Sequence, residues 1–278
     1  MARGVSLAGN PVWFVNAFAD GFYAGNTAAV VLVEGYPPEA AMLDLAREFG
    51  FSETAFLKRL GPAEYQIRWF TPEVEVPLCG HATLASAKSL FASSEAGSEL
   101  LTLHSLSGPL IARRKGDLIE LDFPSDIPQP HIAEPEVLQA LGPVNPMEVL
   151  RARGTRNLVL VFERPQALLE LRPDFAALAA LTGLSWFGIA VTAPGTAQDY
   201  ICRYFAPWEG INEDPVTGSA QTFLAPYWSG KLGRKVLSGF QASERGGAFE
   251  VEVLESRVLI RGHACIYLRG ELAAGWRD

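Results

Sequence analysis

The sequence predicts an α+β fold of two pseudo-symmetric lobes, each an antiparallel or mixed β-sheet or barrel wrapped around one central buried helix. The main observation is an internal repeat. Arg68 to Pro72 (RWFTP) resembles Arg203 to Pro207 (RYFAP) 135 positions later, and Pro38-Glu39 matches Pro173-Asp174 at the same offset. Solenoid repeats are roughly 20 to 50 residues long, so this period indicates a duplicated domain.

The domain boundary is predicted where three prolines lie close together, between Pro124 and Pro130. Such a segment is typical of a connection between lobes. We therefore expect an N-terminal lobe at residues 1–124, to which the last few C-terminal residues are a candidate addition, and a C-terminal lobe at 125–278. Two related lobes that face each other form a cleft, and clefts between lobes are preferred sites for small molecules.

Hydrophobic periodicity predicts the elements of the first half. Apolar residues between Glu39 and Phe49 recur at helical spacing after a Pro-Pro pair, which predicts an amphipathic helix. The segment from His81 to Phe91 is small or apolar on every side, and such a helix is a buried one. Strands are predicted from β-branched and aromatic residues at 12–18, 28–33, 54–58, 65–70, 100–106, 110–114 and 118–123.

The second half repeats this scheme. Helices are expected from Pro173 to Leu181 and from Ser219 to Trp228, the second in the place of the buried helix of the first half. Strands are expected at 158–162, 188–192, 200–205, 236–240, 248–255 and 265–268. Each half is therefore a sheet around a buried helix, which is an α+β pattern.

The composition excludes several classes of protein. The 278 residues are 49% hydrophobic and carry a net charge of −8, which opposes binding to nucleic acid or to an anionic membrane. The longest apolar run, Ala28 to Val33, is far shorter than the ~20 residues of a membrane span, and no signal-peptide core follows Met1. Three cysteines without CxxC spacing predict free thiols, and we expect a cytoplasmic protein.

The starts of the two buried helices carry matching small residues, Gly80-His81-Ala82 and Gly218-Ser219-Ala220. Main-chain N–H groups at a helix start are uncovered and carry about half a positive charge, so they bind carboxylates without Lys or Arg. Taken singly, each sequence is explained by close packing. Their recurrence at matching points predicts that both starts face one small carboxylate-bearing substrate.

No cofactor or metal ion is expected. The sequence has no GxGxxG or Walker loop for a nucleotide and no Gly-x-Ser-x-Gly elbow of a hydrolase. His263 and Cys265 are too few for a closed zinc site.

Six segments together resemble the signature segments of the PhzF-like (phenazine-biosynthesis-like) family. They are Asn16 to Phe18, Gly25-Asn26, Phe51 to Phe56, Arg68 to Pro72, Cys79 to Ala85 and Glu213 to Ala220. The resemblance implies a diaminopimelate-epimerase-like fold, a site between the lobes, and cofactor-independent isomerisation by proton transfer. It also suggests a homodimer.

The resemblance assigns roles to individual residues. The family's catalytic glutamate corresponds to Glu53, and its histidine, aspartate and serine correspond to His81, Asp214 and Ser219. Its loop asparagine corresponds to Asn26. The residues agree with these roles. Phe51 and Phe56 give Glu53 an apolar setting, which disfavours the charged carboxylate and favours the neutral acid. A group that takes a proton and later returns it needs such a setting. As structural alternatives, Glu53 is a solvated strand residue, His81 a core histidine, and Asp214 or Ser219 a helix cap.

Cys79 is a further candidate. Related diaminopimelate epimerases use two cysteines at the corresponding helix starts, and helix N-termini lower the pKa of thiols. Here the second position is Thr217, so a two-thiol racemisation is not expected, and Cys79 is either a substrate contact or a small buried hydrophobe. The chain also has Thr27 where the family commonly has Pro, which affects the rigidity of that loop.

Together these observations predict a cofactor-independent isomerase of a small carboxylate-bearing metabolite. The expected catalytic residues are Glu53, His81 and Asp214. The expected substrate-binding residues are Asn26, Cys79, Gly80, Ala82, Gly218, Ser219 and Ala220. Two alternatives stay open: an amino-acid-type epimerase or racemase that uses Cys79 with Glu53, and a non-catalytic module that binds ligands or proteins on the same fold.

Overall fold

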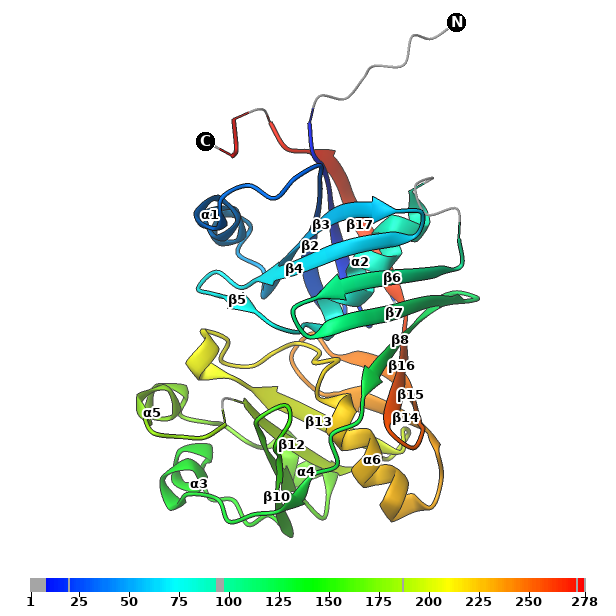
Figure 1. Ribbon diagram of the computed structural model, residues 1–278. Helices are drawn as coiled ribbons and strands as arrows, with labels where there is room; N and C mark the ends of the chain where they lie inside the picture. The colour runs from blue at the N-terminus through cyan, green and yellow to red at the C-terminus, as the bar shows by residue number, and fades with distance from the viewer. Residues whose placement is uncertain (1–8, 20, 94–97, 187, 274, 278) are drawn as a thin grey trace, which may run out of the picture.

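The computed structural model describes residues 9–19, 21–93, 98–186, 188–273 and 275–277, arranged as two stacked units that share one sheet (Figure 1). The strands of the first unit, called the N-terminal lobe, follow the order β17-β1-β2-β3-β4-β6-β7-β8. They are β1 Pro11–Ala17, β2 Asn26–Val33, β3 Glu53–Gly61, β4 Glu64–Phe70, β6 Leu100–Ser105, β7 Gly108–Lys115, β8 Leu118–Pro124 and β17 Ala264–Glu271, with a short β5 Glu75–Val76 beside β4.

The second unit, called the C-terminal lobe, repeats this topology in the order β9-β10-β11-β12-β13-β14-β15-β16. Its strands are β9 Gln129–Pro130, β10 Glu148–Ala152, β11 Asn157–Val161, β12 Gly188–Pro194, β13 Tyr200–Phe205, β14 Val236–Gln241, β15 Gly247–Val253 and β16 Arg257–Gly262. The two parallel pairs, β11 with β12 and β13 with β14, match β2 with β3 and β4 with β6. The duplication seen in the sequence is therefore also a duplication of strand order and direction.

Two pairings tie the lobes together. Strand β16 pairs with β8, so the sheet continues from one lobe into the other, and the C-terminal strand β17 pairs with β1 at the chain's opposite end. The boundary near residue 124 itself stays a prediction.

Each lobe holds one long helix against its sheet, α2 Gly80–Ala92 and α6 Gln221–Leu232 (Figure 1). The buried α2 contacts β1, β2, β3, β7, β8 and β17, as its apolar sequence predicts. Its two buried serines are satisfied inside the helix, because Ser86 and Ser89 donate to the carbonyls of Ala82 and Ala85 at 2.7 and 3.0 Å. The remaining helices are α1 Glu39–Phe49, α3 Pro135–Leu141, α4 Pro165–Leu169, α5 Phe175–Ala180 and the 3₁₀ turn η1 Pro207–Glu209.

The start of α6 differs from the prediction. The helix begins at Gln221, not at Ser219, because the N–H groups of Gln221 and Thr222 donate to the carbonyls of Gly218 and Ser219 at 3.1 Å each. These bonds reach back three residues and wind Gly218 to Ala220 into a tighter turn. Strands β10 and β16 and helices α3 and α4 were not predicted at all.

The two lobes repeat one ion pair in the same form. Arg68 donates to both carboxylate oxygens of Glu75 at 2.7 and 2.6 Å, and Arg203 donates to both oxygens of Glu213 at 2.7 and 2.8 Å. Each guanidinium also lies over the ring two residues further on, 5.1 Å from Phe70 and 5.0 Å from Phe205. A two-pronged pair is geometrically demanding, so each fixes the segment that leads from the central strand to the helix start.

Replacing Asp174 by Ala is expected to destabilise the protein by about 1 kcal/mol, because Asp174 caps α5. Its carboxylate accepts from the N–H of Ala177 at 2.9 Å, and alanine leaves that donor without the bond. Urea unfolding measures the loss, and Asp174→Asn, which retains an acceptor, should recover most of it. Equal stability of both variants would contradict the capping role.

Two further observations bear on the expected class of protein. Cys79, Cys202 and Cys265 are all free thiols, as their odd number predicts. Among the described residues, no helix has the length and apolar character that a bilayer span requires.

Candidate active site

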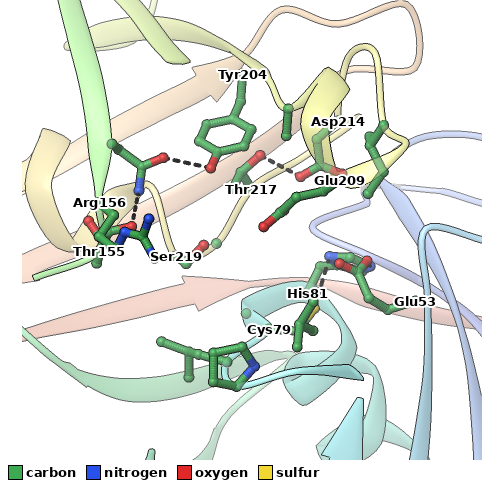
Figure 2. A pocket seen from close by; sticks show the side chains of 18 of the residues that line it. Glu53, Cys79, His81, Thr155, Arg156, Tyr204, Glu209, Asp214, Thr217 and Ser219 are labelled. Atoms are coloured by element: carbon green, nitrogen blue, oxygen red, sulfur yellow. Dashed lines mark hydrogen bonds and ion pairs between the residues drawn. The ribbon is translucent and has the colours of Figure 1, made fainter. Parts of the chain in front are cut away.

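A cavity of about 320 Å³ lies where the two lobes meet (Figure 2). Its wall combines the start of α2 and the end of β5 from the N-terminal lobe with the β10–β11 turn, η1 and the turn before α6 from the C-terminal lobe. The residues with polar or ionisable side chains in this wall are Glu53, Cys79, His81, Ser107, Thr155, Arg156, Asn157, Tyr204, Glu209, Asp214, Thr217 and Ser219. Chain segments more than a hundred residues apart therefore form one pocket.

The two matching helix starts touch each other at the floor of this cavity. A β-carbon on Gly80 would lie 2.8 Å from the Cα of Gly218 and 2.9 Å from the nitrogen of Ser219. Such approach is closer than carbon atoms permit, so only glycine fits at Gly80. Neither α2 nor α6 has a side-chain cap, so the N–H groups at these two starts give this region partial positive charge.

Glu53 and His81 form the ionisable centre of the cavity. Glu53 begins β3 and His81 is the second residue of α2, and their Oε2 and Nε2 atoms lie 3.1 Å apart with side chains 12% and 3% exposed. Both atoms are buried, and the pair is not aligned as a hydrogen bond. The carboxylate and the imidazole therefore lie within proton-transfer distance, and they form an ion pair when His81 is protonated.

A buried amide connects this centre to the second lobe. Asn26, at the start of β2, donates from Nδ2 to Asp214 Oδ1 at 2.7 Å and to the carbonyl of Val216 at 3.1 Å. Because these two acceptors use both amide hydrogens, Nδ2 has no hydrogen left for His81 Nδ1, although that atom is also 3.1 Å away. Asn26 thus orients Asp214 across the lobe interface. It lies behind the cavity wall and does not line the cavity.

The glycine before Asn26 fixes this loop. Gly25 has φ +73° and its β-carbon would meet the carbonyl oxygen of Ala17 at 2.2 Å, so no other residue fits. Arg245 of the C-terminal lobe donates to the Gly25 carbonyl at 2.7 Å. Thr27, which stands where the family commonly has Pro, donates to Asn16 at 2.6 Å, so a side-chain bond holds this position.

Cys79 is the third group at the imidazole. Its sulfur lies 3.5 Å from His81 Nδ1, on the other side of the ring from Glu53. Burial raises the pKa of the Cys79 thiol to about 11, and the nearby Glu53 carboxylate adds to this effect. Burial opposes the charged form of His81, but the Cys79 sulfur and the Glu53 carboxylate outweigh it and bring the pKa of His81 well above 6.5. Burial therefore favours the neutral thiol of Cys79, and with the thiol neutral the Glu53 carboxylate is the neighbouring charge that favours a protonated His81.

Glu53, Cys79 and His81 are also the kind of residues that bind metal ions, and their ligand atoms lie within 4.8 Å of one another. The sulfur approaches Nδ1, however, whereas the carboxylate approaches Nε2. A cation bound to Nδ1 would be separated from the Glu53 carboxylate by the imidazole ring, and a cation bound to Nε2 would be separated from the Cys79 sulfur. The group therefore surrounds an imidazole, not a single coordination point, and the absence of a metal ion stays a prediction.

Asp214 follows η1 and is held from several sides. The hydroxyl of Thr217 donates to its Oδ2, and the backbone N–H of Asp214 donates to the Tyr204 carbonyl at 3.0 Å. Burial raises the pKa of Asp214 to about 6; His81 and the bonds from Thr217 and Asn26 lower it, whereas Glu53 raises it. Asp214 therefore exchanges its proton close to neutral pH.

Apart from Thr217, sequence reasoning did not identify the other polar groups of the wall. Tyr204 donates to Asn157 at 2.6 Å, and Asn157 in turn donates to the carbonyl of Thr155 at 2.8 Å. Arg156 has a left-handed φ of 55° beside Thr155. Figure 2 shows Thr155, Arg156 and Ser219 on one side and Glu53, Glu209 and Asp214 on the other. Tyr204 lies in the repeated RYFAP segment, which was the one available signal.

Glu209 is the one acid of the cavity wall that was not predicted, and its side chain points into the cavity (Figure 2). Burial first, and then the charges of Glu53 and Asp214, raise its pKa to about 7 from the ordinary 4.5. Between these values the folded protein binds more protons than the unfolded chain, so stability decreases as the pH rises through this window.

Replacing Glu209 by Gln is therefore expected to raise the melting temperature at pH 8 and to leave it unchanged at pH 4, where the acid is protonated in both states. Thermal unfolding at the two pH values measures the difference. An equal change at both values would show that the substitution acts through packing and not through the charge.

The structure brings most of the expected site residues into this one cavity. Glu53, Cys79, Gly80, His81, Asp214, Gly218 and Ser219 line it, whereas Asn26, Ala82 and Ala220 do not. Ala82 and Ala220 lie one residue further along their helix starts, and the N–H of Ala82 is directed at the Cys79 sulfur. The roles of all ten residues stay predictions.

The chain is similar to known proteins over almost its whole length. The family model of the phenazine biosynthesis-like proteins matches residues 15–270. A Pseudomonas aeruginosa protein named as an uncharacterized isomerase is 42% identical over 94% of this chain and 98% of its own. A crystal structure of a phenazine biosynthesis protein of the PhzF family from Enterococcus faecalis shares 42% identity and a TM-score of 0.88, covering 95% of this chain and 99% of its own.

The fold extends to more distant proteins. A probable proline racemase from Agrobacterium radiobacter K84 has a TM-score of 0.64 at 11% identity, covering 95% of this chain and 93% of its own, which shows a shared fold alone. Together with the duplicated topology, these similarities confirm the predicted α+β fold class. The chain belongs to the phenazine biosynthesis-like (PhzF) family of isomerases.

Proposed function

We propose that the protein is a cofactor-independent isomerase that moves a proton within a small carboxylate-bearing metabolite. One observation carries this proposal. The Glu53 carboxylate lies 3.1 Å from His81 in a cavity whose floor is formed by two touching helix starts. A base and a set of hydrogen-bond donors for a developing negative charge are the two parts that proton abstraction beside a carboxylate requires.

Each part has its own task in this mechanism. Glu53 removes a proton from carbon and returns one, while negative charge develops on the substrate oxygens. The N–H groups near Gly80, Gly218 and Ser219 stabilise that charge, since they are already oriented and need no rearrangement. His81 and Asp214 assist, with His81 facing Glu53 and Asp214 held by Asn26 and Thr217.

The proposal is tested by incubating the protein with a panel of cyclic and acyclic carboxylates in D₂O and following deuterium by NMR. We expect exchange at a carbon-bound position, with isomerisation, for a subset of the panel. If no carboxylate exchanges a proton, a non-catalytic module on this fold becomes the better interpretation.

A second candidate is an amino-acid-type epimerase that uses Cys79 with Glu53. In its favour, Cys79 lines the same cavity and contacts His81 at 3.5 Å. Against it, the pKa of about 11 leaves little thiolate at neutral pH. Deuterium at a stereocentre with inversion, lost in Cys79→Ser, would select this alternative.

We extend the proposal to the setting of the enzyme. It acts on a small molecule without a nucleic-acid or membrane partner, in the cytoplasm, and as a homodimer. The net charge of −8 supports the first part, because the chain has no overall attraction for polyanions. Gel filtration with light scattering tests the dimer.

A further inference from the structure

We propose that Gln241 is a positioning residue of this site, which holds the segment Asp214 to Thr217 so that the Asp214 carboxylate faces the cavity. Gln241 ends β14, is completely buried, and does not line the cavity. Neither the sequence patterns nor the family resemblance assigns Gln241 to the site. The inference deepens the proposed function and rests on it for the role of Asp214.

The contacts of Gln241 bracket the segment at both ends. Its Nε2 donates to the Asp214 carbonyl at 2.6 Å and to Thr217 Oγ1 at 3.2 Å, while its Oε1 accepts from the Thr217 N–H at 2.8 Å. One amide therefore satisfies a carbonyl, a hydroxyl and an N–H within four residues. In a buried loop without regular structure, each of these groups would destabilise the fold if it were left unpaired.

The bond to the Thr217 hydroxyl gives this clamp a direction. The hydroxyl has one hydrogen, which it donates to Asp214 Oδ2, and it accepts from Gln241 Nε2. The chain of donors therefore runs from Gln241 through Thr217 to the Asp214 carboxylate. A hydroxyl that accepts one hydrogen bond becomes a better donor in the next, so the amide both fixes and strengthens the last bond.

Gln221 supports the same segment from the other side. Its Nε2 donates to the Thr217 carbonyl at 3.2 Å and its Oε1 accepts from Tyr200 at 2.7 Å. Together with Gln241, it satisfies both backbone groups of Thr217 with buried side chains. Of these two glutamines, Gln241 is the one that also donates to Asp214.

The titration of Asp214 reports on this arrangement. The charged or titratable groups that act on its carboxylate are Glu53 of β3, His81 of α2, Tyr204 of β13 and Glu209 of η1. Burial raises the pKa of Asp214, and the Thr217 bond is among the contacts that lower it, with the balance at about 6. If Gln241 holds Thr217 in place, its removal weakens that bond and raises the pKa of Asp214 further.

The test uses Gln241→Met, which retains the volume but has no donor or strong acceptor. The carboxyl of Asp214 is titrated by ¹³C NMR in the wild type and the variant, with no substrate needed. We expect an upward shift of roughly one pKa unit. An unchanged Asp214 titration in a cooperatively folded variant would overturn the proposal.

Two further variants make the result specific. In a Thr217→Val background, Gln241→Met should shift the pKa of Asp214 by less than it does in the wild type, because the part of the effect that runs through the hydroxyl is already lost; an equal shift in both backgrounds would contradict the chain of donors. Should Gln241→Met fail to fold, Gln241→Asn, which is one methylene shorter and cannot span both ends of the segment, is measured in the same way.

The matched control is Thr192→Val in the same lobe. Thr192 is equally buried and loses two bonds, to the Ile201 carbonyl at 2.7 Å and from the Trp228 ring nitrogen at 2.9 Å, yet it does not line the cavity. Its stability loss should be comparable while the Asp214 titration stays that of the wild type. If Thr192→Val shifts Asp214 as much as Gln241→Met does, the effect is general destabilisation and the proposal is wrong.

The outcomes separate this inference from the proposed function. A shifted Asp214 titration without any proton exchange by the wild type would retain Gln241 as a clamp and reject the isomerase. Where the wild type does exchange protons, the exchange rate of Gln241→Met should fall at least about tenfold with the acid limb of its pH profile moved upward. A loss of rate without that movement would contradict the positioning role.

Discussion

Replacing Glu53 by Gln is expected to abolish deuterium exchange into the substrate while leaving the fold intact. The amide has almost the size of the carboxylate but accepts no proton at the operating pH, so the 10²- to 10⁴-fold contribution of a positioned general base is lost. The side chain is 12% exposed and its Oε2 lies 3.1 Å from His81 Nε2; the glutamine amide loses the charge of this ion pair but keeps a polar group of the same size in that place, so we expect the fold to be retained.

The measurement compares exchange rates in D₂O for any carboxylate on which the wild type is active, with urea unfolding to verify the fold. Glu53→Asp moves the carboxylate back by one methylene and is expected to lose about 10²-fold, since a displacement near 1 Å has that cost. Glu34→Gln, at an exposed glutamate outside the cavity, is the control and should exchange at the wild-type rate. A wild-type rate in Glu53→Gln would remove Glu53 from the mechanism.

The fold was predictable because its signals are local or repeated. The segment from His81 to Phe91 is apolar on all sides, and it is the buried centre of its lobe. Strand β16 was missed because it is short and has Arg257 and Arg261 on the face opposite the buried Val258 and Ile260. These arginines pair with Asp122 at 2.7 Å and Glu120 at 2.8 Å on β8, across the joint of the lobes. Charges that match a partner 135 and 141 residues away cannot be identified in one segment alone.

Helices α3 and α4 were missed for a different reason. Both begin at a proline, Pro135 and Pro165, which is a favourable first residue. They have only seven and five residues, however, and so too few turns to show an apolar face. Helix α4 packs against β12 and β13, and α3 packs against α5, contacts that the sequence of either helix does not display.

The candidate site divides in the same way. Glu53, His81 and Asp214 could be named because they lie in segments with a family pattern. Glu209 and Gln241 could not, because their significance arises only when β14 and η1 are brought to the turn before α6. Residues that support a site, or that shift the pKa of its groups, act through contacts between distant parts of the chain. They therefore follow no fixed spacing in the sequence.

Replacing Gly80 by Ala is expected to separate the two helix starts and to reduce both stability and activity. The new methyl group would lie 2.8 Å from the Cα of Gly218, 2.9 Å from the nitrogen of Ser219 and 3.0 Å from the carbonyl carbon of Gly218. All three atoms belong to backbone, which cannot rotate away as a side chain would. The backbone of one lobe must therefore shift, at a cost of about 1–3 kcal/mol for an overpacked core.

The exchange rate should also fall, and not only the free energy of unfolding. The N–H groups near Gly80 and Ser219 serve the reaction only if both point at the same oxygen atoms, and a shift near 1 Å costs about 10²-fold in rate. Urea unfolding and deuterium exchange measure the two effects.

Gly230→Ala is the matched control, because Gly230 also lies in a helix, α6, but has no atom within 4 Å of its β-carbon position. Alanine should stabilise that helix by roughly 0.5–1 kcal/mol and leave the exchange rate unchanged. If Gly80→Ala behaves like Gly230→Ala, the helix starts do not depend on their close contact, and a carboxylate site built from both lobes loses its physical basis.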